Sequence, residues 1–216
     1  EGAFYNSNRL WEVVIPESVS KIGRQAFDIC ERANVLYRGS TLPSDLDSNW
    51  GWSESAEMIT NVTDVGETED GRFLYYLTGD GYAGVYKYLD YEENVVIPEK
   101  IQDLPVKKIG TAAFMDNSSV MNVIIPNSVI SIADNAFYEC YNLKDVSWPE
   151  ELVSIGEKVF YECKNLENVT LHDKVEYIGE WAFRDCSSIT SVVIPNTVTK
   201  LECGVFDSCT SLKDVT

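Results

Sequence analysis

Six cysteines, one histidine and several closely spaced carboxylates are the residues of this chain whose chemistry suits catalysis or metal binding. His172 lies beside Asp173, but a general base needs a nucleophile or carboxylate in convergent geometry, and nothing in the sequence suggests a triad. The carboxylates between Asp64 and Asp70 lack the alternating D-x-D-x-D-G spacing of a calcium loop. We interpret that stretch as a solvated linker. The sequence contains no C-x-x-C pair, so the cysteine spacing does not suggest a zinc site. We therefore predict no catalytic residue, no metal site and no cofactor.

The cysteines follow a strict spacing. Phenylalanine recurs every 23 residues from Phe114 to Phe206, and most cysteines lie three residues after such a phenylalanine. Equivalent side chains of stacked repeats point the same way, and parallel Cα–Cβ vectors disfavour disulfides. Cys203 lies outside this spacing and is predicted to be an exposed thiol. We predict a column of free, buried thiols at Cys30, Cys140, Cys163, Cys186 and Cys209, with Asn117 in the place of one of them.

A fixed period in the twenties is typical of a solenoid, in which each repeat packs only against its neighbours. Each repeat carries a β-branched V-x-I segment of period two, which predicts a short strand, and a proline usually ends that strand. The A-F segment behind it is predicted to be a short helical or irregular turn whose phenylalanine rings stack in the core. Gly110, Gly156 and Gly179 precede this turn and are predicted to adopt a backbone conformation closed to other residues.

Two repeat arrays are separated by a different segment. Phe4 and Phe27 are also 23 residues apart, but the gap of 87 residues from Phe27 to Phe114 is not a multiple of 23. Residues 71–93 hold two aromatic runs joined by a Gly-Asp-Gly turn, which predicts a β-hairpin that caps the second array. The predicted organisation is the end of a first array (1–40), a terminal loop or linker (41–70), the capping hairpin (71–93) and a second array of five phenylalanine-marked repeats (94–216). Because residue 1 falls within a repeat, we interpret the chain as part of a longer protein.

The charge balance restricts the partners. The chain has 17 Lys and Arg against 35 Asp and Glu, a formal net charge of −18, which repels phosphate backbones and anionic lipid. No apolar run reaches the roughly 18 to 20 residues that span a bilayer, and the first residues given show no basic segment followed by an apolar signal core. We predict a partner that is neither nucleic acid nor membrane.

The motif A-F-x-x-C-x-x-L-x-x-V-x-I-P-x-x-V-x-x-I-G, as in residues 136–156, resembles the BspA-like class of leucine-rich repeat. The resemblance extends over nearly all the chain except residues 41–70. It implies an α/β repeat solenoid, a leucine-rich-repeat-like right-handed stack of short parallel strands with a β-hairpin cap. It also implies a secreted or cell-surface bacterial protein that attaches to host matrix proteins, epithelium or other microbes. The family offers no catalytic residue to carry over.

The candidate binding surface comes from the V-x-I strands, whose outward residues are predicted to line the concave side. Short polar groups beside exposed aliphatic groups suit a protein partner. The alternative interpretation is that this face binds nothing and simply accepts any small residue. The candidate residues are Asn122, Ile124, Asp145, Ser147, Asn168, Thr170, Ser191 and Val193.

We predict a non-enzymatic recognition or adhesion module that binds a host matrix or microbial surface protein. A glycan-binding module that uses Trp50, Trp52 and the hairpin tyrosines is one alternative, and exposed rings would favour it. A passive structural spacer is the other.

Overall fold

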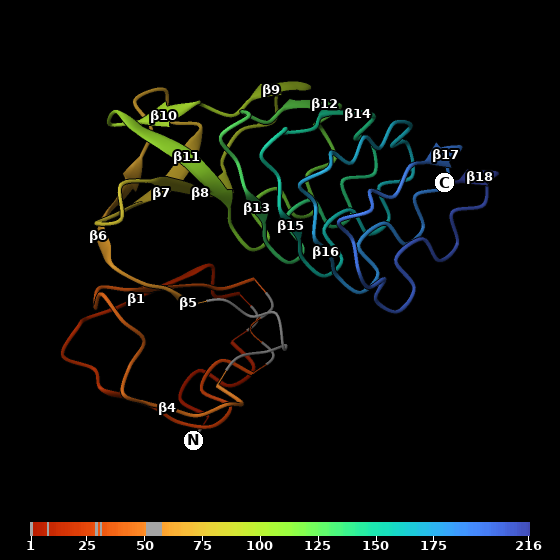
Figure 1. Ribbon diagram of the computed structural model, residues 1–216. Helices are drawn as coiled ribbons and strands as arrows, with labels where there is room; N and C mark the ends of the chain where they lie inside the picture. The colour runs from red at the N-terminus through yellow and green to blue at the C-terminus, as the bar shows by residue number, and fades with distance from the viewer. Residues whose placement is uncertain (1, 8, 29, 31, 51–57) are drawn as a thin grey trace.

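The computed structural model describes residues 2–7, 9–28, 30, 32–50 and 58–216. Parallel strands stack into a solenoid of about 8 turns. Figure 1 shows the N-terminal stack in red and orange, and the second array from green to blue at the C-terminus. The parallel strands are as predicted, but the helical part of the α/β prediction is wrong, since the described residues contain no helix.

The backbone of the phenylalanine turn explains why no helix forms there. Asn135 and Glu139, on either side of Phe137, have left-handed φ values of 58° and 56°. The N–H groups of Asn135, Phe137 and Glu139 donate to carbonyl oxygens of the following repeat at 2.9, 2.8 and 2.8 Å. An α-helix would direct these donors to carbonyls of their own segment. The turn therefore forms a hydrogen-bonded ladder between repeats.

Two rows of strands run along the second array. The V-x-I strands are β9 (Asn94–Val96), β12 (Asn122–Ile124), β14 (Asp145–Ser147), β17 (Ser191–Val192) and β18 (Asp214–Val215). The second row consists of β11 (Leu104–Ile109), β13 (Ser131–Ile132), β15 (Ser154–Ile155) and β16 (Tyr177–Ile178). The strands pair in parallel, β9 with β12 with β14 and β11 with β13 with β15 with β16. A short strand β10 (Lys100–Ile101) adds to β11 in the antiparallel sense.

The predicted phenylalanine column fills the space between the two rows. The rings of Phe114, Phe137, Phe160, Phe183 and Phe206 stack in sequence, with centroids 4.7, 5.2, 5.3 and 5.3 Å apart. The first four rings are at most 1% exposed. Offset parallel rings at this spacing combine a large buried area with favourable ring contacts. The prediction of a core column is confirmed.

The thiol column runs beside the rings. The five phenylalanine-linked cysteines are buried and Cys203 is exposed, as predicted. Each buried Sγ lies 2.9 to 3.2 Å from the carbonyl oxygen of the phenylalanine one repeat earlier. Asn117 stands in the same column and donates through Nδ2 to the carbonyl of Asp90 at 3.2 Å. The position therefore requires a small donor for a buried carbonyl, and burial raises the pKa of the Cys163 thiol well above its usual value.

The repeat glycines have a different role from the one predicted. Gly156 and Gly179 do not have positive φ; instead the neighbouring repeat approaches them closely. A Cβ on Gly179 would lie 2.5 Å from the carbonyl carbon of Gly156, and a Cβ on Gly156 would lie 2.5 Å from Oδ1 of Asp134. The lack of a side chain matters here for packing between repeats and not for backbone freedom.

The N-terminal stack continues further than the sequence predicted. It contains β1 (Glu12–Ile15), β2 (Lys21–Ile22), β3 (Asn34–Tyr37), β4 (Asp45–Leu46) and β5 (Met58–Ile59). β4 pairs in parallel with β2, and β5 with β3. Residues 41–70 are therefore not simply a loop or linker, although the boundaries 1–40, 71–93 and 94–216 remain an interpretation of the sequence.

An antiparallel meander joins the two stacks. It consists of β6 (Val62–Glu67), β7 (Phe73–Thr78) and β8 (Ala83–Tyr88). β7 and β8 form the predicted hairpin, and β8 pairs in parallel with β11, so the meander extends the second row of the array. Figure 1 shows it between the N-terminal stack and the array.

The two faces of the hairpin contact different stacks. Phe73 and Tyr88 pack on Phe114, with ring centroids 6.4 and 5.0 Å away, and so extend the phenylalanine column. Tyr76 and Tyr86 point to the other side, where they join a buried cluster with Leu36, Ile59 and Val62. Hydrogen bonds reinforce this junction: Asn34 Nδ2 donates to the carbonyl of Thr111 at 3.0 Å, and its Oδ1 accepts from Thr111 N at 2.9 Å.

Candidate functional site

The V-x-I face, defined as the outward side chains of β9, β12, β14 and the equivalent segments up to residue 193, brings the eight candidate residues together. Asn122 lies opposite Asp145, and Ile124 opposite Ser147. Thr170 is bridged to Val193. Val96, Ile124 and Val193 are 53, 52 and 61% exposed. The candidates therefore form two adjacent rows, one polar and one mixed with exposed aliphatic groups; Asn168 and Ser191 complete the polar row.

Side-chain hydrogen bonds order the polar row. Asn122 Nδ2 donates to Oδ1 of Asn94 at 2.7 Å, and Asn168 Nδ2 donates to Oδ1 of Asp145 at 3.2 Å. In the next row, Ser147 Oγ accepts from the backbone N–H of Ile125 at 3.0 Å. These contacts hold short side chains on a regular backbone, and such a surface needs little ordering when a partner binds.

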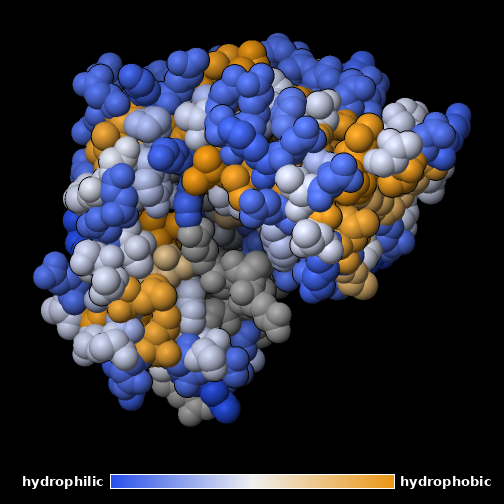
Figure 2. All heavy atoms as spheres, in the orientation of Figure 1, coloured by the Kyte–Doolittle hydropathy of each residue, from blue (hydrophilic) through white to orange (hydrophobic). Residues whose placement is uncertain are grey.

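A hollow of about 820 Å³ lies over the second strand row and not over the V-x-I strands. Asp134, Glu157 and Glu180 line it at one 23-residue spacing, with Tyr177 beside them. Burial is the main cause that raises the pKa of Tyr177, and the carboxylates of Glu202 and Glu157 add to it. Figure 2 shows the surface hollowed beneath this row. The 23-residue spacing of Asp134, Glu157 and Glu180 could have indicated this acidic hollow from the sequence. The hollow is not among the sites predicted above.

The hairpin tyrosines do not form an exposed sugar platform. Tyr75, Tyr76, Tyr86 and Tyr88 are buried, whereas Tyr91, after the hairpin, is 77% exposed. Trp50 is partly buried and packs edge-on against Phe27, with ring centroids 6.1 Å apart. Trp52 lies outside the described residues. Burial of four rings favours the capping role over sugar stacking by the hairpin itself.

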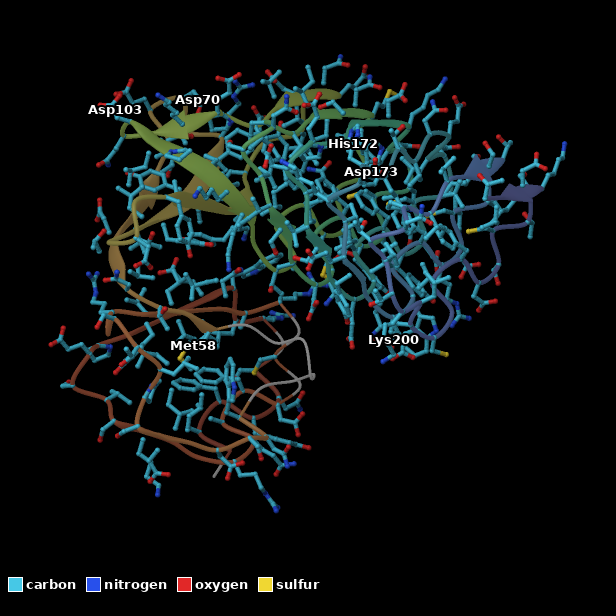
Figure 3. The ribbon with its side chains drawn as sticks, viewed as in Figure 1. Met58, Asp70, Asp103, His172, Asp173 and Lys200 are labelled. Atoms are coloured by element: carbon cyan, nitrogen blue, oxygen red, sulfur yellow. The ribbon has the colours of Figure 1, made fainter. Side chains whose placement is uncertain are left out.

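His172 and Asp173 project from one turn of the second array, on the opposite side of that array from Lys200 (Figure 3). His172 occupies the position at which other repeats have proline. Its carbonyl accepts the N–H of Val175 in the turn that follows. Among the described residues, no group of three His, Cys, Asp or Glu side chains is arranged to hold a metal ion. Within the same residues, no segment forms a helix capable of crossing a bilayer.

The carboxylates from Asp64 to Asp70 are not a linker, which corrects the sequence interpretation. Asp64 and Glu67 belong to β6, and Asp70 closes the turn that follows it. Hydrogen bonds from Thr68 and then Arg72 lower the pKa of Asp70 to about 2. Asp70 therefore stabilises the β6–β7 turn, and its side chain lies near the β10 end of the molecule in Figure 3.

Comparison with solved structures supports the repeat architecture. A leucine-rich repeat protein from T. pallidum is 33% identical with a TM-score of 0.66, and the match covers 69% of this chain and 71% of that chain. A leucine-rich repeat protein from Bacteroides ovatus is 29% identical with a TM-score of 0.60, over 67% of this chain and 39% of that chain. A leucine-rich cell surface protein from Faecalibacterium prausnitzii shares the fold at 22% identity and a TM-score of 0.64, and this chain spans 62% of its length.

None of the curated proteins matches the chain. A family of BspA type leucine-rich repeat regions matches it in 6 copies, over residues 1–47 and 86–216. These residues include the phenylalanine and cysteine columns and both strand rows. The protein belongs to the family of BspA type leucine-rich repeat proteins.

Proposed function

We propose that this chain is a non-enzymatic recognition module of a bacterial cell-surface or secreted protein, and that its V-x-I face binds a protein partner. The observation that carries the proposal is the alignment of Val96, Ile124 and Val193, each more than half exposed, beside an ordered polar row. Aliphatic groups in such rows supply desolvated contact area, and the polar row supplies hydrogen bonds that set the register of the partner.

The surface location draws on structural relatives. One is described as a leucine-rich cell surface protein and another as the pneumococcal vaccine antigen PcpA. Adhesion to a host matrix or microbial surface protein fits such a location. The chemistry also suits binding better than turnover, because the buried thiols are occupied as donors to backbone carbonyls. Among the residues that the structure describes, none forms a hydrogen bond or ion pair with the His172 side chain that would make a catalytic pair.

A paired set of charge variants tests the proposal. Ile124→Lys with Val193→Lys places two cations on the V-x-I face. Leu42→Lys with Leu201→Lys makes the same change at two leucines of nearly equal exposure, 53 and 52%, that lie outside it. Immobilised matrix proteins, mucin and microbial surface proteins are probed with each variant and with the native chain by biolayer interferometry.

We expect the native chain and the Leu42, Leu201 control to bind a protein ligand equally. The V-x-I variant should bind at least about tenfold more weakly, since loss of a hot-spot residue near the centre of an interface costs about 2 kcal/mol or more. Equal loss in both variants would indicate a general charge effect and contradict the assignment of the face. Absence of binding by the native chain would favour the passive spacer, and loss only on Trp50→Ala would favour a glycan module.

A further inference from the structure

The junction between the two stacks contains a crevice that is separate from the V-x-I face. It has a volume of about 350 Å³, and Trp11, Lys87, Asp90, Tyr91 and Met115 are among its lining residues. These residues come from the N-terminal stack, the end of the hairpin and the first phenylalanine turn of the second array. A hollow of this size assembled from three segments is within the usual range for a small ligand.

Lys87 is the unusual charge of this crevice. Its Nζ lies 3.8 Å from the centroid of the Trp11 ring, and no carboxylate of the described residues lies within ion-pair distance of it. The guanidinium of Arg32 is also near the Trp11 ring, at 5.5 Å. Burial, and then the like charge of Arg32, lower the pKa of Lys87. In a chain with a net charge of −18, two cations thus lie together at Trp11, and one of them, Lys87, has no acidic partner among the residues that the structure describes.

Arg32 is held differently. Its Nη2 donates to Oδ2 of Asp116 at 2.8 Å, and both side chains are about a third to a half exposed. Asp116 therefore balances Arg32 and fixes it near Trp11, while Lys87 keeps an uncompensated charge that faces the crevice. An anionic group entering here gains a charge-assisted hydrogen bond without displacing an existing ion pair.

The rest of the lining defines the kind of anion. The Tyr91 ring is 77% exposed and offers an open aromatic face. Asp90 accepts the Tyr91 N–H at 2.8 Å, and as a carboxylate it has further acceptor capacity. A simple carboxylate would gain nothing from Asp90 and would be repelled by it. A sugar acid carries a carboxylate for Lys87, hydroxyl donors for Asp90 and an apolar ring face for Tyr91.

We propose that the junction crevice is a binding site for a carboxylated sugar, with the carboxylate at Lys87, hydroxyl groups at Asp90 and the sugar ring against Tyr91. The site is independent of protein binding by the V-x-I face. It differs from a glycan platform on Tyr75, Tyr76, Tyr86 and Tyr88, because those four rings are buried.

Matched ligands test the chemistry. The full chain is titrated with methyl β-glucuronide and methyl β-glucoside, which differ in the carboxylate, and with methyl galacturonide and N-acetylneuraminic acid as further sugar acids. A capped Ala-Glu-Ala peptide supplies a carboxylate without a sugar. Binding is followed by ligand-observed NMR and by chemical shifts of the protein amides.

Lys87→Gln removes the charge, Tyr91→Ala removes the exposed ring, and Lys213→Gln is a control at an exposed lysine outside the crevice. We expect at least one sugar acid to bind and the neutral glucoside and the peptide to bind at least tenfold more weakly. Lys87→Gln should weaken binding by about tenfold or more, as expected for a lost hydrogen bond to a charged group. Tyr91→Ala should weaken it severalfold, and Lys213→Gln should leave it unchanged.

Three results would overturn the proposal. The first is no binding of any sugar acid at millimolar concentration. The second is binding of the peptide or glucoside as tight as that of the acids. The third is native affinity in both Lys87→Gln and Tyr91→Ala, with amide spectra that show both variants folded.

Discussion

Removal of the Phe160 ring is the sharpest test of the column that holds the repeats together. Phe160 is fully buried, and its centroid lies 5.2 Å from that of Phe137, 5.3 Å from that of Phe183 and 5.3 Å from that of Trp148. Burial of such a ring contributes about 1.5 to 3 kcal/mol, and each ring pair adds about 0.5 to 1.5 kcal/mol.

The cavity left by Phe160→Ala cannot collapse easily, because the backbone on both sides is tied to its neighbours. Phe160 N–H donates to the carbonyl of Ala182 at 2.7 Å, and its own carbonyl accepts the Cys186 thiol at 3.0 Å. We therefore expect a cost of about 4 to 5 kcal/mol, the upper part of the range of about 3 to 5 kcal/mol for such truncations.

Urea unfolding followed by circular dichroism measures this cost, and Phe4→Ala is the control. Phe4 is 42% exposed, and among the described residues its ring stacks on that of Phe27 alone, at 5.0 Å. We expect this variant to lose about 1 kcal/mol. A loss below about 1 kcal/mol for Phe160→Ala, or equal losses in the two variants, would refute the account of the column.

Four further predictions concern the thiols, the glycines and the junction. In the native chain Cys203 alone should react with a thiol reagent, and all 6 cysteines should react in denaturant, as counted by mass. Burial raises the pKa of Cys209 from 9.0 to about 11, so between these pH values the folded chain keeps a thiol proton that the unfolded chain loses. The contribution of Cys209 to stability is therefore complete below pH 9.0 and is lost as the pH rises to about 11. Cys209→Ala should flatten the fall of Tm in that window. Gly179→Ala should destabilise by about 1 to 3 kcal/mol in urea melts, because the new Cβ meets backbone at 2.5 Å. Asn34→Ala should cost about 2 to 4 kcal/mol, because it leaves the buried N–H and C=O of Thr111 without their partner, and an unchanged melt would contradict that role.

The features that could be predicted from the sequence are those that depend on the periodicity of side chains. Phenylalanine and cysteine recur every 23 residues, so their columns, the V-x-I strands and the placement of the eight candidate residues on one face follow from the register of the repeats. Of the two alternatives for the A-F segment, a helical or an irregular turn, the helical one was wrong, because the partners of its N–H groups lie in the next repeat, beyond the reach of local pattern. Asn135 and Glu139 adopt left-handed φ without being glycine; asparagine tolerates this conformation better than most residues, but the identity of Glu139 does not indicate it.

Residues 41–50, 58 and 59 show where a prediction from sequence periodicity fails. They carry no repeat period, yet Gln25 N–H donates to the carbonyl of Asn49 at 2.6 Å and Phe27 N–H to that of Trp50 at 3.0 Å. Backbone hydrogen bonds continue the stack there, together with the packing of Leu46, Trp50 and Met58 on the N-terminal core. The junction crevice is also invisible to pattern analysis, since Trp11, Lys87 and Asp116 come from segments separated by tens of residues and meet only through the fold.

The hairpin carried a signal that the sequence analysis did not use. A strand that only caps a solenoid end has one face toward solvent and should alternate apolar and polar residues. Phe73–Leu77 is apolar at every position, a pattern typical of a strand covered on both faces. The structure covers it in that way: Phe73, Tyr75 and Leu77 join the core of the second array, and Leu74 and Tyr76 join the cluster on β3 and β5. The hairpin is therefore a connector between the two stacks as well as a cap.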